Sequence, residues 1–395
     1  MQDSLTKILK TVVRQWILPP AAYTVVNRSL KTLLGVHIRP PDSDLRRGDI
    51  DISLNADDHP EPDTPDPALI QEIHRNFRLA KRDQTGVPLA YKPGAGWAHV
   101  IQTQWNFFLD AVEAGNSDEL ERFFQNFFRY PIMEGFWGET IDTFLHLGGA
   151  DLFSRQFAAW REMEPAEDVG NLEAPPIGNP WGFEVSGRLL IQPMLEYWWQ
   201  AGYFKGLLST LDRPLVVEIG GGFGGLAYAL GRRIHDFCYV GFDLPENIAL
   251  QHYYLARAYP DKKVAGYGSV GTRAMRMEDL LKHDVLLLPN FMLDKMPSGS
   301  ANMVINVRSL AEMPDVTIAE YLRQIERICK GWFFHENIYK QRKDARHGIP
   351  SPLWPPLHNF APIARSISRW PRYSATSAYP CAECLYLRKD CLALH

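Results

Sequence analysis

Between residues 68 and 162 the hydrophobic positions recur with helical spacing, and no strand-like alternation of hydrophobic and polar residues intervenes. Such spacing is typical of amphipathic helices. The expected helices cover residues 69–79, residues 97–114, a stretch after Asn116, and residues 139–161. Asn116 and Glu119 have the spacing of a capping box, in which side chains bind free backbone amides at a helix start. The region therefore predicts a helical bundle.

From residue 215 onward, short β-type runs alternate with helical patterns. Strands are expected at 215–219, 237–242, 285–288, 303–307, 332–334 and 384–388. Helices are expected before the first strand (189–208), after it up to Arg233, and at 245–259 and 317–330. Strands and helices that alternate at this spacing form a parallel sheet with helices on both faces. The fold class is therefore α/β.

Two polar, proline-rich stretches, residues 40–67 and 164–182, are expected to be linkers. Three regions follow: residues 1–66 with an amphipathic helix and a linker, a helical domain at 67–210, and an α/β catalytic domain at 211–395. A proline-rich segment from Ala345 to Pro380 carries several aromatic residues, Trp370 among them. It is read either as a loop that binds carbohydrate or as a plain surface excursion.

The first 35 residues combine apolar positions at helical spacing with interspersed lysines and arginines. A basic amphipathic helix can lie on an anionic membrane surface, or it can pack on its own protein. No run of about 18 apolar residues, the length that spans a membrane, is present. We therefore expect a cytoplasmic protein, with peripheral contact to the inner face of the membrane, if any, through residues 1–35.

Composition narrows the class of partner. The chain of 395 residues is 46% hydrophobic and 22% charged, as in soluble globular proteins. Its formal charge of −4 argues against nucleic acid as the main partner, because phosphate binding needs a clustered basic face. The five cysteines are an odd number, which indicates reduced thiols rather than a disulfide framework. Cys381 and Cys384 lack a second pair at zinc spacing, so no metal is predicted.

The candidate chemistry is concentrated after the first β-type run. Leu215–Ile219 leads into Gly220, Gly221, Gly222 and Phe223, and then into a helix. Gly220 allows a sharp turn, Gly222 allows a ligand to approach the backbone, and the helix start attracts anionic groups. Asp243 follows 23 residues after Gly220, near the end of the next strand, where an acid can accept hydrogen bonds from ribose hydroxyls.

Two adenosine-containing cofactors fit this pattern: a nicotinamide dinucleotide and S-adenosylmethionine. Glu218 favours the second, because a carboxylate at the strand end suits the ammonium of a methionine moiety and sits poorly beside a pyrophosphate. The downstream sequence also offers no nicotinamide catalytic set. An NAD(P)-dependent oxidoreductase and a catalytically inactive S-adenosylmethionine-binding scaffold protein are the alternatives.

The sequence resembles the bacterial sugar O-methyltransferases, a branch of the class I Rossmann-like methyltransferases. The resemblance rests on residues 217–225, 242–246 and 305–313, extends weakly over residues 95–390, and departs at Asn302, where the family has an acid. It implies S-adenosylmethionine as donor and a sugar hydroxyl as acceptor, often in polysaccharide biosynthesis. The cofactor-binding residues carried by the pattern are Glu218, Gly220, Gly221, Gly222, Phe223, Asp243 and Leu244, with Asn290 and Asn306 at the cofactor edge.

A sugar hydroxyl is a poor nucleophile, so a general base within hydrogen-bond reach should speed its methylation. In wound parallel sheets ligands lie beyond the carboxyl ends of the strands, so the residues after the strands at 303–307 and 332–334 should face the acceptor. His335 is the first choice for the base and Glu312 the second, with Arg308 as a further catalytic candidate. Ser309 and Asn337 are expected to bind the acceptor. A homodimer is left open, with the helical region as dimer surface or lid.

Overall fold

The computed structural model describes residues 52–55, 57–59, 62–133, 149–338, 357–370 and 381–392. All of them belong to one compact unit that begins at Asp44. The predicted basic helix within residues 1–35, the start of the helix predicted at 139–161, and parts of the 345–380 segment lie outside these ranges. Within the described residues, no helix is both long enough and apolar enough to cross a membrane.

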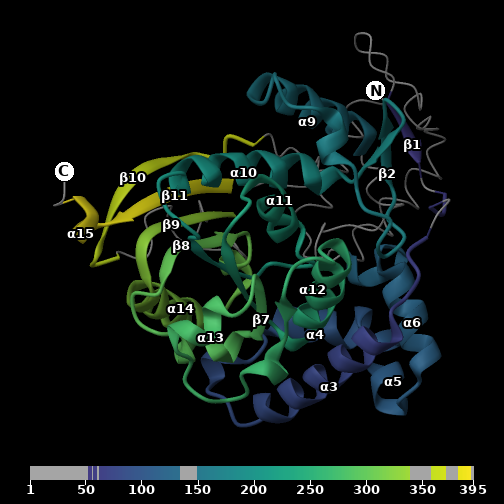
Figure 1. The fold of residues 1–395 in the computed structure, drawn as a ribbon, viewed down its shortest axis with the longest axis horizontal. Coiled ribbons are helices and arrows are strands. Elements are labelled where there is room, and N and C mark those ends of the chain that lie inside the picture. The colour runs from purple at the N-terminus through teal and green to yellow at the C-terminus, as the bar shows by residue number, and fades with distance from the viewer. Residues whose placement is uncertain are drawn as a thin grey trace, which may run out of the picture. The chain divides into compact units, whose positions relative to one another are not determined.

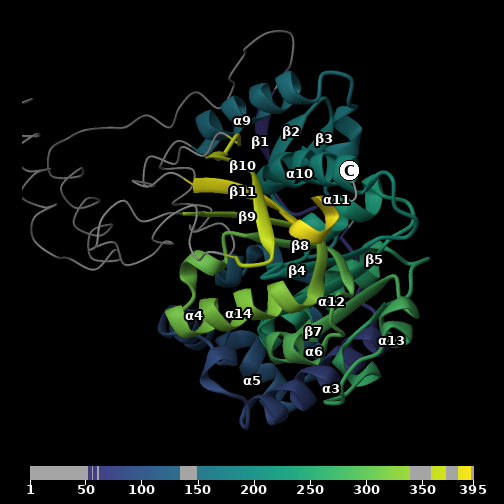
Figure 2. The ribbon, with the colours of Figure 1, turned by 90° about the vertical axis from the view of Figure 1, so that its left-hand side faces the viewer.

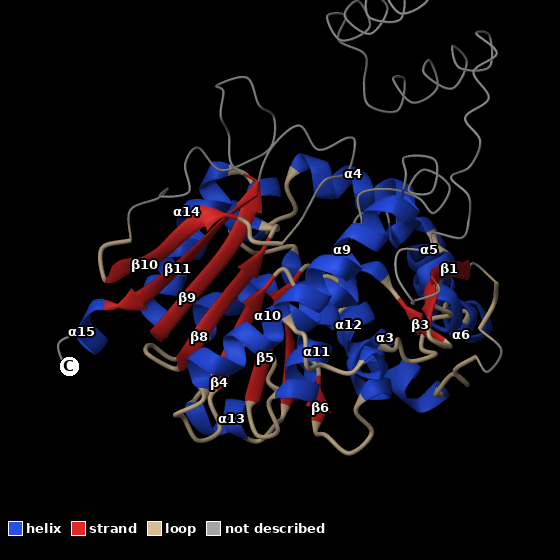
Figure 3. Ribbon diagram, turned by 90° about the horizontal axis from the view of Figure 1, so that it is seen from above, coloured by secondary structure: helices blue, strands red, loops and turns tan. Residues whose placement is uncertain are grey.

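In the described part of the chain, eight strands form one sheet in the order β10-β11-β9-β8-β4-β5-β7-β6. The strands from β6 to β9 are parallel, whereas β11 runs antiparallel to β9 and β10 antiparallel to β11. Figure 3 shows the long strands side by side. Their bounds are β4 Leu215–Ile219, β5 Cys238–Asp243, β6 Val264–Ala265, β7 Val285–Pro289, β8 Ala301–Val307, β9 Cys329–Ile338, β10 Phe360–Ile367 and β11 Cys381–Arg388. This sheet confirms the α/β, Rossmann-like class.

The order of the strands reverses at β4. The chain passes from β4 to β5 on one side, and later to β8 on the other side of β4. At such a switch point the two connecting loops diverge and leave a crevice beyond the carboxyl ends of the strands. The glycine-rich turn that follows Ile219 lies at this crevice.

Helices cover both faces of the sheet (Figure 1). The helices α10 (Gln192–Leu208), α11 (Gly225–Arg233) and α12 (Pro245–Ala258) share one hydrophobic cluster with Val216, and α13 (Met277–Leu281) and α14 (Asp315–Ile328) share another with Val217. Successive side chains of a strand point to opposite faces, so these neighbours in β4 belong to different layers. Every residue of β4 is buried, as expected for a central parallel strand.

The predicted helical region contains α3 (Pro67–Gln84), α4 (Ala95–Gln104), α5 (Asn106–Ala114), α6 (Ser117–Asn126) and α9 (Gly149–Met163). Of these, α3 to α6 lie together beside α12 (Figures 1 and 2). The Asn116 side chain caps α6 by accepting from the Glu119 amide, whereas the Asn116 amide donates to the Ala111 carbonyl, so only one half of the predicted capping box is formed. The single helix predicted at 97–114 is two helices, and the chain turns between them at Trp105, whose buried ring packs on Phe108 and Phe123.

The described parts of both predicted linkers are ordered structure, which corrects those two predictions. Residues Ile52–Asn55 form β1, which pairs antiparallel with β2 (Gly182–Val185), and β2 pairs with β3 (Arg188–Leu190). The second stretch also contains a short 3-10 helix at Val169–Leu172. Gly182 permits the pairing, because a Cβ there would collide with the Leu190 carbonyl oxygen.

Asp63, in the first predicted linker, is tied to α12. Its carboxylate accepts hydrogen bonds from the Arg257 guanidinium, with a closest distance of 2.5 Å, and from the Tyr253 hydroxyl at 2.9 Å. The Asp63 side chain is 9% exposed. Thus the chain that enters α3 is fixed to the helical layer of the large sheet.

The described part of the 345–380 segment adds β10 to the edge of the sheet. Trp370, a candidate carbohydrate contact in one of the two readings of this segment, is 1% exposed and stacks on Trp199 of α10 with ring centroids 6.0 Å apart. A ring buried in this way has no face left for a sugar. Trp370 is therefore a packing residue.

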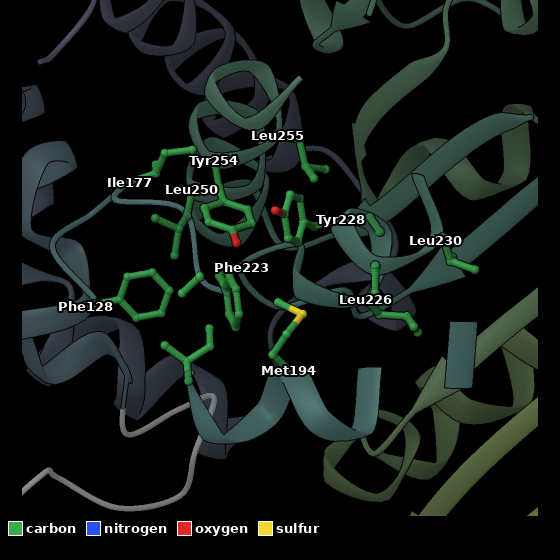
Figure 4. Packing of buried hydrophobic residues seen from close by; sticks show 14 of the residues in the cluster. Phe128, Ile177, Met194, Phe223, Leu226, Tyr228, Leu230, Leu250, Tyr254 and Leu255 are labelled. Carbon is green, nitrogen blue, oxygen red and sulfur yellow. The ribbon is translucent and has the colours of Figure 1, made fainter. Parts of the chain in front are cut away.

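One hydrophobic cluster includes residues of the helical region and of the layer formed by α10, α11 and α12. Phe223, directly after the glycine-rich turn, lies among Phe128, Met194 and Tyr254 (Figure 4). Its ring centroid is 5.3 Å from those of both Phe128 and Tyr254. The predicted boundary near residue 210 stays a prediction, and the residues on its two sides share this core.

We predict that Asp63→Ala lowers the free energy of unfolding by about 1–3 kcal/mol, because it leaves the partly buried Arg257 without its carboxylate. Urea denaturation measures the change. Asp151→Ala, which breaks the exposed pair with Arg155, is the matched control and should change stability by less than about 0.5 kcal/mol. Equal effects of the two substitutions would contradict the anchoring role of Asp63.

Candidate active site

The turn after β4 is built by glycines in the left-handed backbone region, with φ of 79° at Gly220 and 59° at Gly222. The Gly220 amide donates to the Phe242 carbonyl at 2.8 Å, which holds the turn against the end of β5. A Cβ at Gly220 would collide with the Ser309 side chain. Both the backbone angle and the close approach of the 308–312 loop therefore require glycine here.

A cavity of about 420 Å³ opens at this turn, where β4, β5, β7 and β8 end. It brings together most of the residues predicted for the site. The predicted residues in its lining are Glu218, Gly220, Gly221, Gly222, Phe223, Asp243, Leu244, Asn290, Arg308, Ser309 and Glu312. His335, Asn306 and Asn337 are not among them.

Asp243 is fixed at the end of β5 by three hydrogen bonds. Its Oδ2 accepts from the Gly222 amide at 3.1 Å, and its Oδ1 accepts from the Leu244 amide and the Asn247 side chain at 2.7 and 2.9 Å. Burial raises the pKa of this carboxyl to about 7, against the opposing effect of these donors. The carboxylate is thus rigidly placed, and its charge is poorly solvated.

Glu218 lies beside it at the end of β4. The side chain is 2% exposed, and its Oε2 accepts a hydrogen bond from the Tyr239 hydroxyl at 2.6 Å. Burial raises the pKa of Glu218 to about 7, and the nearby charge of Asp243 adds to the rise. Two carboxyls with raised pKa values therefore flank the glycine-rich turn, an arrangement that a cationic ligand would relieve.

Three buried polar atoms of the lining make no hydrogen bond to any described residue: Asn290 Oδ1, Asn247 Oδ1 and Thr317 Oγ1. Asn290 is oriented by its amide nitrogen, which donates to the Tyr91 carbonyl at 3.0 Å and to the Tyr321 hydroxyl at 2.8 Å. A buried acceptor without a donor costs about 1–3 kcal/mol, which a ligand donor can recover. The exocyclic amino group of an adenine is a donor of the required kind.

Asn306 and Asn337 lie behind the cavity, which corrects the roles predicted for them at the cofactor edge and in acceptor binding. Both are fully buried. Asn306 donates to the Ile219 carbonyl and to Ser309 Oγ, and Asn337 donates to Asn306 Oδ1 at 3.0 Å. The Ala311 amide completes the network by donating to Asn337. These two amides join β4, β9 and the 308–312 loop, so they position the loop and have no access to a ligand.

His335, the first choice for the base, is also corrected. Its ring is 3% exposed and packs against both Phe333 and Tyr386, with ring centroids 5.5 and 5.8 Å away. Burial lowers its pKa to about 4, so the ring is neutral at ordinary pH. It belongs to the layer of aromatic residues on the α14 side of the sheet.

Arg308 has φ of 67°, unusual for a residue with a side chain. Its amide donates to the Glu336 carbonyl at 2.6 Å, and its guanidinium lies 3.4 Å from the Glu196 carboxylate. A left-handed non-glycine residue that the surroundings hold in place is often found at a functional site. Here it turns the chain back over the glycine-rich turn and brings Ser309 against it.

Glu312 accepts a hydrogen bond at Oε2 from the Trp97 indole at 2.8 Å. Solvent reaches Glu312 through the open cavity, yet protein atoms crowd it on its other sides. This partial desolvation raises its pKa, while the Trp97 hydrogen bond and the Arg308 charge oppose the rise. Glu312 is therefore an accessible carboxylate of the lining with a pKa moved toward neutrality.

Residues of the helical region complete the lining, and sequence reasoning did not identify them. They come from the segment before α4, from α4 and α9, and from the start of α10: Lys92, Pro93, Gly94, Trp97, Leu152, Gln156, Gln192, Pro193, Glu196 and Tyr197. The aromatic run at Tyr197 was the one visible signal. The hydrogen bond from Trp97 to Glu312, for example, joins residues 215 positions apart in sequence, so no local motif could indicate this part of the lining.

The sequence matches no protein-family model and no curated protein. Similar solved structures include the magnesium protoporphyrin IX methyltransferase ChlM of Synechocystis PCC 6803 with bound SAM, at 12% identity and a TM-score of 0.34, over 59% of this chain and 91% of that one. The mitomycin 7-O-methyltransferase MmcR is 14% identical, with a TM-score of 0.33, over 50% of this chain and 55% of its own. At these values the function has to be argued from this chain's own residues.

The raised pKa values of Glu218 and Asp243 have a consequence for stability. The folded state holds these protons more tightly than the unfolded state, so the stabilisation is complete below about pH 4 and is lost as pH rises through about 7. We predict that Glu218→Gln removes roughly 2–3 kcal/mol of the fall in unfolding free energy between pH 5 and pH 8. Denaturant titrations of the ligand-free protein across this range test it.

The control is Glu113→Gln, on an exposed position of α5, which should keep the pH dependence of the wild-type protein. A Glu218→Gln protein with the wild-type slope would contradict the unfavourable burial of this carboxyl.

Proposed function

We propose that the chain is an S-adenosylmethionine-dependent O-methyltransferase that acts on a hydroxyl of a sugar or of a glycosylated small molecule. The observation that carries the proposal is the pair of carboxyls, Glu218 and Asp243, that flank the glycine-rich turn at the switch point of the sheet. This role agrees with the resemblance of the sequence to the bacterial sugar O-methyltransferases.

The two carboxyls beside the turn favour one of the two cofactors that the glycine pattern allows. A pyrophosphate would bring two negative charges next to two poorly solvated carboxyls, which repel it. An ammonium suits Glu218, and two ribose hydroxyls can donate to Asp243. S-adenosylmethionine, when bound, supplies a methyl group on a positively charged sulfur. The buried Asn290 Oδ1 is a fitting acceptor for the amino group of its adenine.

Glu312 takes the role of general base in this proposal. It is the carboxylate on the accessible side of the cavity, and the Trp97 indole fixes its orientation. A base whose pKa is raised toward neutrality removes a hydroxyl proton more effectively, as long as it remains ionised at the working pH. With the cofactor bound, the hydroxyl proton would pass to Glu312 as the acceptor oxygen bonds to the methyl carbon and the bond from that carbon to sulfur breaks, which leaves S-adenosylhomocysteine.

Arg308 and Ser309 have supporting parts. Arg308 pairs with Glu196, and its positive charge lowers the pKa values of Glu312 and Glu336 against the rise that burial causes. Ser309 Oγ donates to the Ile219 carbonyl at 3.1 Å, so it supports the turn as well as lining the cavity. Both residues therefore set the geometry between the cofactor side and the acceptor side.

The part of the cavity lining that comes from the helical region, here called the roof, favours a carbohydrate acceptor. Trp97 offers an aromatic surface, and Gln156, Gln192 and Lys92 offer polar groups that suit hydroxyls. Positioning of the two reactants can itself supply much of the rate. We place the enzyme in the cytoplasm, in polysaccharide biosynthesis, and leave membrane contact through residues 1–35 and a homodimer as parts of the proposal.

Isothermal titration tests the cofactor. We expect the purified full chain to bind S-adenosylhomocysteine and not NADH, and Asp243→Ala to weaken that binding at least tenfold because the ribose hydroxyls lose their acceptor. Asp236→Ala, an exposed change just before β5, is the control and should leave the affinity unchanged. Binding of NADH in place of S-adenosylhomocysteine would turn the proposal into an oxidoreductase.

Transfer of labelled methyl groups to glycans in a cell extract tests the base. We expect Glu312→Gln to reduce the rate by about 100- to 10,000-fold, with the affinity for S-adenosylhomocysteine within twofold of wild type. His335→Gln, which changes the buried histidine, should keep most of the activity. Cofactor binding with no transfer by the wild-type protein would favour an inactive scaffold, and full activity of Glu312→Gln would remove its role as base.

A further inference from the structure

Tyr239 lies directly behind Glu218. It belongs to β5, is fully buried, and donates its hydroxyl hydrogen bond to Glu218 Oε2 at 2.6 Å. Glu218 lines the cavity and Tyr239 does not. Tyr239 can therefore influence a ligand only through the carboxyl that it holds.

The neighbouring backbone leaves room for this ring. A Cβ on Gly221 would stand 3.2 Å from the Tyr239 hydroxyl and 3.1 Å from Gln251 Oε1, and a Cβ on Gly241 would stand 3.1 Å from the Tyr239 ring. The Gln251 amide is fully buried and makes no hydrogen bond to any described residue. The polar side chains of Tyr239 and Gln251 thus lie behind the turn, and the Tyr239 hydroxyl donates its hydrogen bond to Glu218.

Several ionisable groups face Glu218 from the surrounding elements. Tyr239 and Asp243 of β5 and Tyr197 of α10 interact with Glu218. Glu196 of α10 and Arg308 of the loop after β8 line the same cavity. The Asp243 charge raises the pKa of Glu218, and the Tyr239 hydrogen bond lowers it. Tyr239 therefore opposes burial and keeps part of the carboxyl population charged.

We propose that Tyr239 is a positioning residue that holds Glu218 in place for the ammonium of an amino-acid-bearing nucleoside, so that the pair selects such a ligand over the bare nucleoside. The inference rests on the proposed function and assigns the recognition of the methionine part to a side chain outside the cavity. A charge-assisted hydrogen bond fixes the rotation of a carboxylate, which lowers the entropy lost when a cation binds.

Two commercially available ligands separate this role from a structural one. S-adenosylhomocysteine carries the ammonium, whereas 5′-methylthioadenosine has the same adenosine and thioether without the amino-acid part. We expect Tyr239→Phe to weaken S-adenosylhomocysteine binding about tenfold and to leave 5′-methylthioadenosine binding within twofold of wild type, as measured by isothermal titration. Tyr254→Phe is the matched control. It removes a buried hydroxyl close to the same turn, and this hydroxyl makes no hydrogen bond to any described residue.

The pH dependence gives a second readout. The preference for S-adenosylhomocysteine over 5′-methylthioadenosine should increase from pH 6 to pH 8 as Glu218 loses its proton, and this increase should move to higher pH in Tyr239→Phe. Both ligands carry the ribose that the proposed function assigns to Asp243, so the ratio of their affinities reports on the amino-acid part at Glu218.

The outcomes are distinct. Equal loss of affinity for both ligands, or no loss for either, would overturn the role of Tyr239 and leave the proposed function intact. A wild-type protein that binds neither ligand would overturn the proposed function itself.

Discussion

The hydrogen bond from the Gly222 amide to the Asp243 carboxylate joins the glycine-rich turn to the end of β5. Together with the bond from Gly220 to Phe242, it fixes the turn and the acid in one rigid unit. The other features of the cavity depend on this unit: Ser309 packs against Gly220, and Glu218 comes to lie beside Asp243. Because rigid groups lose little freedom on binding, a site built in this way is ready for its ligand before the ligand arrives.

The same unit has an electrostatic cost. Glu218 is buried and Asp243 is partly buried, and burial raises the pKa of both carboxyls, so their charged forms are less favourable in the ligand-free protein than in water. Such an arrangement reduces stability near neutral pH, so packing does not explain its presence. A ligand that brings a positive charge and hydroxyl donors reverses the penalty, and part of its affinity then comes from relief of an unfavourable state rather than from new contacts.

The sequence predicted six of the eight described strands of the large sheet, all except β6 and β10, and it predicted the residues that line the cavity around the glycine-rich turn. The strand Leu215–Ile219 and the helix that follows it have the predicted bounds, because local hydrophobic pattern and turn residues determine both. The three-stranded sheet was missed, since β1 pairs with β2 across more than 120 residues and its strands are too short to show a period. The choice of His335 failed for a related reason: side chains alternate along β9, so Glu336 faces α10 while His335 and Asn337 face away.

The opposite side of the cavity, where the acceptor is proposed to bind, could not be predicted from local pattern, because helices distant in sequence build it. Helix α10 connects the two sides: Tyr197 lines the cavity, Glu196 pairs with Arg308, and Gln200 donates to Glu336. The strained backbone of Arg308 is therefore held from α10 as well as from the sheet. A substitution in the roof can change which acceptor fits without disturbing the turn, whereas a substitution that shifts α10 would move both sides at once. Under the proposed function, substitutions at Trp97 and Gln156 are expected to change acceptor selection alone, whereas substitutions at Glu196 are expected to affect acceptor and cofactor together.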